Sequence, residues 1–211
     1  MTSTPQDSPR RGRYHHGDLR SALVRTGFDL LAKSGPAAFS VAQVARELGV
    51  STAAPYRHFP DRAHLLAAVA TQAAEELAAE LERAAELAGP DPAERFAATA
   101  GAYVRFVSAR GAGFTVIFAT ELQALHDQTL ATAGRRLMDL LLDLAHEATG
   151  LGPEHSPRLL EQHIALAHGY VALHADGFFS RRQHTVEHLA DQAVEASRTL
   201  LRGLATPRHG P

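Results

Sequence analysis

The chain of 211 residues contains no cysteine and no tryptophan, and aromatic residues make up only 6% of it. The absence of cysteine excludes a disulfide framework, a thiolate metal site and a cysteine nucleophile, and it fits a reducing compartment. No run of 18 or more apolar residues occurs, and residues 1–13 lack the hydrophobic core of a signal peptide. We therefore expect a cytoplasmic protein with no membrane span.

Alanine and other helix-forming residues dominate what is present. The chain is 45% hydrophobic and contains 40 alanines, a globular composition that strongly favours helix. Its length suffices for one large domain or two small ones with a buried core and no metal or disulfide support. We expect an all-α protein.

Charge is distributed unevenly, although the formal net charge is only −2. Residues 1–65 carry nine basic and five acidic side chains, whereas the remainder carries twelve basic and eighteen acidic ones. This asymmetry favours a polyanion-binding surface in the N-terminal third. An ordinary fluctuation of charge remains the alternative interpretation.

The N-terminal third has the pattern of a helix-turn-helix unit. A helical stripe over residues 18–33 is followed by Ser40, which with Gln43 has the form of a capping box, and by a short helix that ends at Gly49. Only a tight turn separates this helix from a second one expected over residues 52–58, for which Ser51 is a favourable N-cap.

The rest of the chain reads as a helical body. A cap at Asp91, with Pro92 at the first helical position, indicates a helix start. Residues 1–13 hold no apolar side chain beyond Met1 and are expected to form a disordered basic arm. The body helices are expected at about residues 62–87, 92–109, 114–125, 127–149, 157–180 and 186–203.

The second helix of such a unit enters the major groove of DNA and faces base edges with its N-terminal residues. Thr52, Ala53 and Ala54 are expected there, because a hydroxyl can hydrogen-bond to a base and methyl groups can contact a thymine methyl. Tyr56, Arg57 and His58 follow and suit phosphate oxygens. The full set of candidate DNA-binding residues is Arg13, Ser40, Ser51, Thr52, Ala53, Ala54, Tyr56, Arg57, His58 and Arg62.

Two segments carry a resemblance to a known family. They are Phe39 to Ser51 (FSVAQVARELGVS) and Pro55 to Arg62 (PYRHFPDR). This pattern resembles the signature of the TetR family of bacterial transcriptional regulators over about residues 14–70. The resemblance implies that Tyr56 and His58 hold the DNA backbone, and that Arg62 occupies the place of a phosphate-binding lysine.

Pro55 departs from the family pattern, which has leucine or another apolar residue there more often. Because proline lacks an amide donor, we expect it to tilt or shorten the reading helix. The three arginines of the arm, Arg10, Arg11 and Arg13, fit a minor-groove contact, and a solvated flexible end is the alternative.

The C-terminal body carries the weaker part of the resemblance. Ala167-His168-Gly169 is similar to a Trp-His-Gly signature of one subgroup, with alanine in place of tryptophan, which could leave more room in a pocket. The resemblance implies a DNA-binding domain over residues 14–66 and a ligand-binding and dimerisation domain over residues 67–205. It also implies that the last two helices form a four-helix bundle with a second copy. Their apolar stripes comprise Leu160, Ile164, Ala167, Val171 and Phe178, then Val186, Leu189, Ala190, Ala193, Leu200, Leu201 and Leu204. Packing of both stripes within one subunit is the alternative.

A ligand cavity is expected among the body helices, where aromatic and aliphatic side chains mix with polar ones. The candidate ligand-binding residues are Tyr103, Phe106, Phe118, Leu122, His163, His168 and Tyr170. The alternative is that each of them is an ordinary core residue. The expected function is a homodimeric repressor that a small-molecule inducer releases from a palindromic operator in double-stranded DNA, and a transcriptional activator of the same fold is an alternative.

Other classes of function find less support. The chain has thirteen histidines, and His184 and His188 have the i, i+4 spacing of two helical metal ligands, which keeps a metal-responsive regulator open. Motifs of hydrolases, zinc proteases and P-loop enzymes are absent, so we expect neither an enzyme nor a bound cofactor. A helical protein-interaction module without a DNA role would leave the capped two-helix unit and the basic third unexplained.

Overall fold

The computed structural model describes residues 16–150, 156–179 and 184–205, and all regular secondary structure in these ranges is helical. This confirms the expected all-α class. The arm over residues 1–13 lies outside the described residues. The elements are α1 (His16–Ser34), η1 (Pro36–Ala38), α2 (Val41–Glu47), η2 (Pro55–Arg57), α3 (Arg62–Leu87), α4 (Pro92–Arg110), α5 (Phe114–Ile117), α6 (Thr120–Gln123), α7 (Gln128–Thr149), α8 (Ser156–Ala175) and α9 (Val186–Ala205), where η denotes a 3₁₀ helix.

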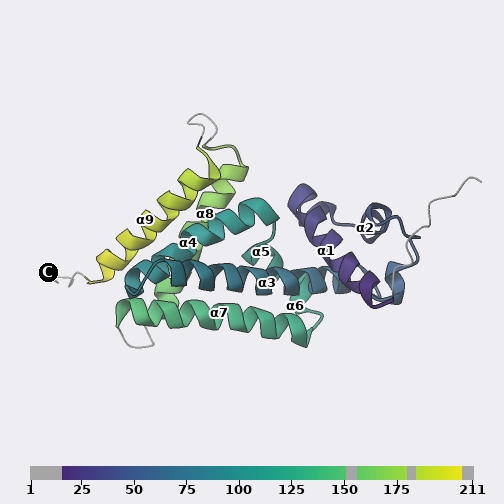
Figure 1. Ribbon diagram of the computed structural model, residues 1–211, viewed down its shortest axis with the longest axis horizontal. Helices are drawn as coiled ribbons and strands as arrows, with labels where there is room; N and C mark the ends of the chain where they lie inside the picture. Colours follow the sequence, from purple (N-terminus) through teal and green to yellow (C-terminus); the bar gives the residue numbers. More distant parts are fainter. Residues whose placement is uncertain (1–15, 151–155, 180–183, 206–211) are drawn as a thin grey trace, which may run out of the picture.

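The helices form a small N-terminal unit and a larger body that share one long helix (Figure 1). The unit consists of α1, α2 and η2 with the first turns of α3, and α3 then continues through the body between α4 and α7. α8 packs against α4 and α7, and α9 lies along α4. The expected domain boundary at residue 66 therefore falls inside a continuous helix.

Small side chains set the close packing around α3. Asp61 caps this helix, because its carboxylate accepts a hydrogen bond from the His64 amide. The buried face of α3 combines leucines such as Leu65 and Leu77 with six alanines. Alanine at these positions leaves room for close approach of α4 and α7 and favours the helical backbone. A helix of 26 residues spans about 39 Å, enough to connect the N-terminal unit to the far end of the body.

Most of the expected body helices are confirmed, and the cap at Asp91 is confirmed by a hydrogen bond of 2.9 Å from the Ala93 amide to its carboxylate. The single helix expected over residues 114–125 is wrong, because the backbone becomes extended at Ala119 and divides it into α5 and α6. The Phe118 ring, which precedes the break, stacks on the Phe114 ring, with 5.9 Å between centroids. The expected end of α8 at residue 180 is also wrong, since α8 ends at Ala175 in a turn.

The N-terminal unit meets the body at the C-terminal end of α4. The Phe28 and Phe106 rings lie 6.4 Å apart between centroids, and the Arg110 guanidinium lies 5.1 Å above the Phe28 ring. Arg110 also pairs with Glu76 of α3 at 2.9 Å and with Asp29 of α1 at 4.0 Å. One arginine therefore connects α1, α3 and α4.

We expect Gly111→Ala to weaken this junction severely. Gly111 ends α4 at φ +62°, and a Cβ there would lie 2.6 Å from Ala32 Cα and 2.8 Å from the Leu31 oxygen, both in the backbone of α1. The free energy of unfolding should fall by at least about 2 kcal/mol, because the left-handed backbone costs about 1 kcal/mol and the clash adds to it. Urea unfolding measures the loss.

Gly150→Ala is the matched control. Gly150 ends α7 at φ +59°, and among the described residues no heavy atom lies within 4 Å of its virtual Cβ. The free energy of unfolding of this variant should fall by only about 1 kcal/mol, the cost of the left-handed backbone. Equal losses for the two variants would show that the approach of α4 to α1 is not tight.

Candidate nucleic-acid interface and candidate ligand pockets

The first helix of the expected helix-turn-helix, α2, begins as predicted at Ser40, whose backbone is extended. The expected capping-box bond is wrong, because the Ser40 side chain makes no cap hydrogen bond. The amides of Gln43 and Val44 instead donate to the Ser40 carbonyl at 3.1 and 3.0 Å. The turn that follows is confirmed, since Gly49 adopts φ +66° and the Val50 amide donates to the Ala45 carbonyl.

The reading segment is shorter than the expected helix over residues 52–58. It consists of a turn closed by a hydrogen bond from the Ala54 amide to the Ser51 carbonyl, followed by the single 3₁₀ turn η2. Pro55 explains the change, because in an α-helix the amide of residue 55 would bond to Ser51, and proline has none. The expectation that Pro55 shortens this helix is confirmed. Its ring is buried, so it also anchors the segment to the unit.

Five of the ten candidate DNA-binding residues lie on the exposed surface of the reading segment. Ser51, Thr52, Ala53, Tyr56 and Arg57 are exposed, and the Tyr56 side chain is 54% exposed although it is aromatic. Ser40, Ala54 and His58 are half-buried at its edge, and Arg13 lies outside the described residues. Two hydroxyls, the methyl groups of Thr52 and Ala53, a phenol and a guanidinium are thus exposed, which is the mixture of groups that base edges and phosphates require.

Arg62 is held by acceptors from two parts of the chain. Its Nε donates to the Phe39 carbonyl at 3.0 Å, its guanidinium lies 5.8 Å above the Phe39 ring, and it pairs with Glu121 of α6 at 3.3 Å. Arg62 therefore bridges the N-terminal unit and the body. Sequence reasoning missed Glu121, because nothing in the pattern around it indicates a partner 59 residues earlier.

The interior of the body is nearly filled. The cavity enclosed by α3, α4, α5, α7 and α8 measures about 10 Å³, no more than a single water molecule needs. Ala167 lines this cavity, so little open space accompanies the small side chain at the tryptophan position. The residues that line this cavity are Leu81, Thr99, Tyr103, Phe114, Leu141, His163, Ile164 and Ala167.

His163 is fully hydrogen-bonded within the core. The Thr99 hydroxyl donates to the Phe96 carbonyl at 2.7 Å, so its oxygen accepts from His163 Nε2 at 2.9 Å, and the Ser197 hydroxyl then donates to Nδ1 at 2.9 Å. The Phe96 ring lies over the imidazole with 4.1 Å between centroids. Burial lowers the pKa of His163 to about 3, so the ring is neutral at pH 7. The helical spacing gave no signal for Thr99 and Ser197, because the three positions lie on different helices.

Tyr103 and His168 form a second internal pair. The Tyr103 hydroxyl and His168 Nδ1 are 3.0 Å apart, and the Phe114 amide donates to the Tyr103 oxygen at 3.4 Å. Burial raises the pKa of Tyr103 to about 12, so the phenol keeps its proton at pH 7.

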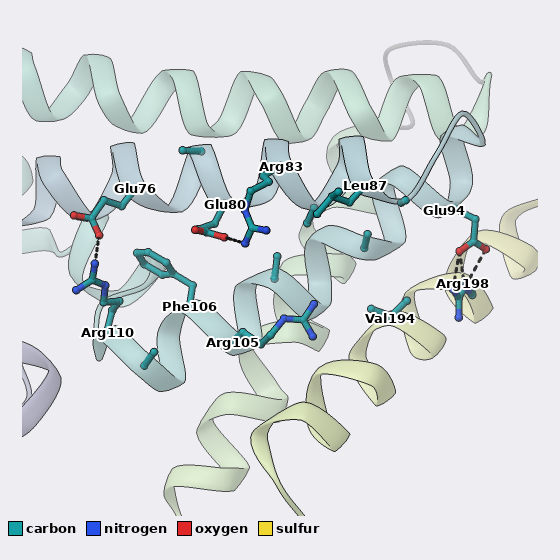
Figure 2. A pocket seen from close by; sticks show the side chains of 16 residues that line it. Glu76, Glu80, Arg83, Leu87, Glu94, Arg105, Phe106, Arg110, Val194 and Arg198 are labelled. Carbon is teal, nitrogen blue, oxygen red and sulfur yellow. Dashed lines mark hydrogen bonds and ion pairs between the residues drawn. The ribbon is translucent and has the colours of Figure 1, made fainter.

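The remaining ligand candidates do not converge on one cavity. Phe118 and Leu122 line a groove of about 430 Å³ between α5, α6 and α7, whereas the Tyr170 ring stacks on the Phe179 ring beyond α8. Phe106 lines a groove of about 930 Å³ between α3, α4 and α9 (Figure 2). Three of the four arginines that line this groove pair with glutamates that also line it: Arg83 with Glu80, Arg110 with Glu76, and Arg198 with Glu94. The fourth, Arg105, pairs with Glu187 of α9.

The apolar stripe of α9 serves the subunit's own core. Leu189, Ala190, Ala193 and Leu201 are buried although no second copy is present, and α9 lies along α4. On α8 the residues Leu160 and Ala167 are likewise buried. A different face of α8 stays open, where Ala165 and Leu173 are exposed and Gly169 and Ala172 are half-buried.

The His184 and His188 rings stack in parallel, with 4.4 Å between centroids. Within the described ranges, no group of three histidine or carboxylate side chains is arranged to hold a metal ion. None of the described helices is both long enough and apolar enough to cross a membrane.

Comparison with known proteins gives two matches to family models and many structural neighbours. Residues 23–69 match the model of bacterial regulatory proteins of the tetR family, and residues 96–197 match a tetracyclin repressor-like C-terminal domain. No curated protein gives a significant match.

Three solved structures illustrate the likeness. A protein of unknown function from Rhodococcus sp. RHA1 is 36% identical, with a TM-score of 0.70 over 93% of this chain and 100% of its own. A tetR-family regulator from Streptomyces coelicolor is 21% identical, with a TM-score of 0.65 over 93% of both chains. The TetR family regulator PfmR from Thermus thermophilus is 18% identical, with a TM-score of 0.61 over 87% of this chain and 99% of its own. The last two likenesses establish the fold.

The buried neutral His163 should make the protein less stable in mild acid. Between pH 6.5 and about 3 the unfolded chain binds a proton at His163 that the folded chain does not bind, so the stabilisation is complete above pH 6.5 and is lost as the pH falls. The expected loss reaches at most about 1.4 kcal/mol per pH unit.

Urea unfolding at pH 7, 6 and 5 measures this loss, with His163→Gln as the comparison. The two proteins differ only at residue 163, so the difference between the two slopes isolates His163. Parallel slopes would mean that His163 is protonated in the folded state.

Proposed function

The chain belongs to the TetR family of bacterial transcriptional regulators, which are DNA-binding proteins and not enzymes, and on this premise we propose that it is a repressor whose homodimer leaves a palindromic operator when a small-molecule inducer binds. The observation that carries the proposal is the exposed surface of Thr52, Ala53, Tyr56 and Arg57 on a tightly turned two-helix unit. The excess of basic side chains in residues 1–65 adds an attraction for DNA that the acidic body does not share.

Each group on this surface has a role that its chemistry supports. Thr52, with the methyl groups of Ala53 and Ala54, faces base edges in the major groove, and Tyr56, Arg57 and His58 bind phosphates. Two alanines offer few hydrogen bonds, so base readout relies on few contacts together with the shape of the DNA.

Ser40, Ser51 and Arg62 flank the reading segment. The two serines stand at the starts of α2 and of the reading segment, where their hydroxyls can donate to phosphates. Arg62 serves the DNA backbone as the usual lysine of the family would, and its pair with Glu121 fixes the position of the guanidinium. Arg13 contributes through the arm.

The open face of α8 supports dimerisation. Ala165, Gly169, Ala172 and Leu173 follow one another at helical spacing, and the small side chains permit close approach of a second copy about a twofold axis. Two reading segments about 34–36 Å apart then meet successive major grooves, and a palindrome follows from the symmetry.

Release follows from linkage between the two sites. An inducer that binds better to the conformer whose reading segments do not match the operator weakens DNA binding, and DNA weakens inducer binding to the same extent. α3 is suited to transmit this shift, because its first turn belongs to the DNA-binding unit and its remaining turns form the core of the body.

Fluorescence anisotropy tests the proposal directly. The purified protein is titrated against labelled DNA from upstream of its own gene and against a scrambled duplex, at about 50 and 200 mM salt. Tighter binding to the upstream DNA that persists at the higher salt supports a sequence-specific regulator of its own gene. Equal affinity for the upstream and the scrambled duplex, lost at the higher salt, would count against the upstream DNA as operator. If a selection from random sequences then also yields no preferred site, sequence-specific recognition is contradicted.

Two substitutions on the reading segment should separate its roles. Arg57→Ala should weaken binding to specific and scrambled DNA alike and reduce the salt dependence by about one counterion, because a phosphate contact carries no sequence information. Thr52→Ala should instead reduce the ratio of the affinity for specific DNA to the affinity for scrambled DNA. For a base contact, this corresponds to a loss of about 1–3 kcal/mol in discrimination. The same anisotropy assay measures both ratios. A loss confined to the specific duplex for Arg57→Ala, or equal losses on both duplexes for Thr52→Ala, would reverse the assignments.

A further inference from the structure

The groove between α5, α6 and α7 differs from the interior cavity in being open and large enough for an organic molecule. Its volume of about 430 Å³ falls in the usual range for small-molecule sites. Its walls are mainly apolar, and the flexible thioether of Met138 can adapt to different shapes. The apolar lining residues are Ile117, Phe118, Leu122, Leu130, Ala131, Gly134 and Met138.

The rim of this groove favours an uncharged occupant. Arg135 and Asp139 lie one turn apart on α7 and contribute opposite charges. The Asp127 carboxylate already accepts the amides of Thr129 and Leu130 at the start of α7, which stabilise its charge in place of a ligand. Two carboxylates against one guanidinium disfavour an anion, the amides that Asp127 accepts take the place of a cation there, and burial of apolar surface supplies the affinity.

Phe118 connects the groove to the interior. Its side chain is 37% exposed, and its ring lies so close to α7 that a Cβ on Gly134 would be only 3.3 Å from it. The ring stacks on Phe114, which stacks in turn on Tyr103 with 4.9 Å between centroids. Because Phe114 and Tyr103 both line the interior cavity, a molecule that displaces Phe118 also changes the packing of the core.

The groove is also connected to the DNA-binding unit. Leu122 and Gln123 line it from α6, and the preceding residue, Glu121, pairs with Arg62. Arg62 in turn donates to the Phe39 carbonyl at the entrance to α2. α6 is one turn long and is held to α5 by a side-chain bond of 3.2 Å, from Gln123 Nε2 to the Phe118 carbonyl. A ligand between α6 and α7 therefore acts on an element that can move with little loss of its own structure.

We propose that the groove between α5–α6 and α7 is the effector site of this regulator, and that it binds an uncharged, predominantly apolar small molecule that weakens DNA binding by separating Glu121 from Arg62. The inference rests on the proposed function, because it assigns the site and the class of the inducer. The loss of DNA affinity follows because the bridge from Glu121 through Arg62 to Phe39 fixes the reading segment relative to the body.

Binding is tested with Nile red, an uncharged apolar dye, titrated into the full-length protein and followed by its fluorescence. Ala131→Phe fills the groove from the α7 side, and Ala131→Glu places a charge in it, so each should weaken Nile red binding at least tenfold. Ala79→Phe is the matched control, since Ala79 is an exposed helical alanine that lines the groove between α3, α4 and α9. It should change the affinity by less than twofold.

Circular dichroism and urea unfolding check that each variant is folded. If one of the two Ala131 variants does not fold, the other still tests the site. Equal dye binding by the Ala131 variants and the Ala79 control would overturn the site. Binding of the sulfonate dye 1-anilinonaphthalene-8-sulfonate as tight as that of Nile red, and equally sensitive to Ala131→Phe, would overturn the preference for an uncharged ligand.

The coupling is tested by anisotropy with specific DNA in the presence and absence of saturating Nile red. The dye should lower the DNA affinity of the wild type at least fivefold and that of Glu121→Ala by less than twofold. Glu147→Ala is the control, because Glu147 also pairs with an arginine of another helix, Arg95 at 2.7 Å, but does not line the groove. It should respond as the wild type does.

An equal dye effect in Glu121→Ala and Glu147→Ala would overturn the coupling route. Failure of this inference is distinguishable from failure of the proposed function, because specific DNA binding is measured without dye. If the protein selects its operator and the dye has no effect on binding, only the effector site is wrong.

Discussion

The continuity of α3 is the constraint on which the rest of the molecule depends. One helix of 26 residues contributes its first turn to the DNA-binding unit, forms the central wall of the body and supplies the surface on which α4 and α7 pack. Many of its buried side chains are alanine, so its neighbours approach closely and any rotation of α3 displaces several of them. A displacement inside the body is therefore transmitted to the reading segment without a flexible linker between the two.

Two arginines and one glycine determine how the DNA-binding unit is oriented on the body. Arg110 joins α1 to α3 and α4, Arg62 joins the entrance of α2 to α6, and Gly111 allows backbone contact between α4 and α1. The contact at Gly111 is steric and the contact at Arg62 is ionic and partly exposed. An exposed ion pair is worth little free energy, so the Arg62 bridge can open in response to a ligand while the steric contact persists.

The features that could be predicted from the sequence are those that depend on residues close together in the chain. Local signals located α2, the turn at Gly49, the cap at Asp91 and the shortening at Pro55, because each rests on residues within one turn. The exposed reading surface followed from the same signals. The capping bond at Ser40 was wrong, because the Ser40 side chain makes no cap hydrogen bond, and the continuous helix over residues 114–125 was wrong, because the backbone leaves the helical conformation at Ala119.

The sequence does not predict the contacts of the candidate ligand-binding residues, because these contacts join distant helices. In the sequence, His163 is a polar residue on an otherwise apolar helix face and was therefore a candidate ligand-binding residue. In the structure, Thr99 and Ser197, 64 and 34 residues away, hydrogen-bond to both of its ring nitrogens. Tyr103 and His168 similarly satisfy each other. Helical periodicity identifies which face of a helix is buried, but it does not show which polar groups meet there.

These internal bonds also explain why a response to a ligand would begin at α5 and α6. Opening the interior cavity directly would separate His163 from its partners and leave buried polar groups without hydrogen bonds, which costs several kcal/mol. The Phe118 ring, by contrast, is partly exposed and held by stacking, and α5 and α6 contribute only a few backbone hydrogen bonds each. α5 and α6 can therefore move at a low cost in free energy, and they lie beside the Glu121–Arg62 bridge to the reading segment. Because the two are adjacent, a modest binding free energy is enough to change the DNA affinity.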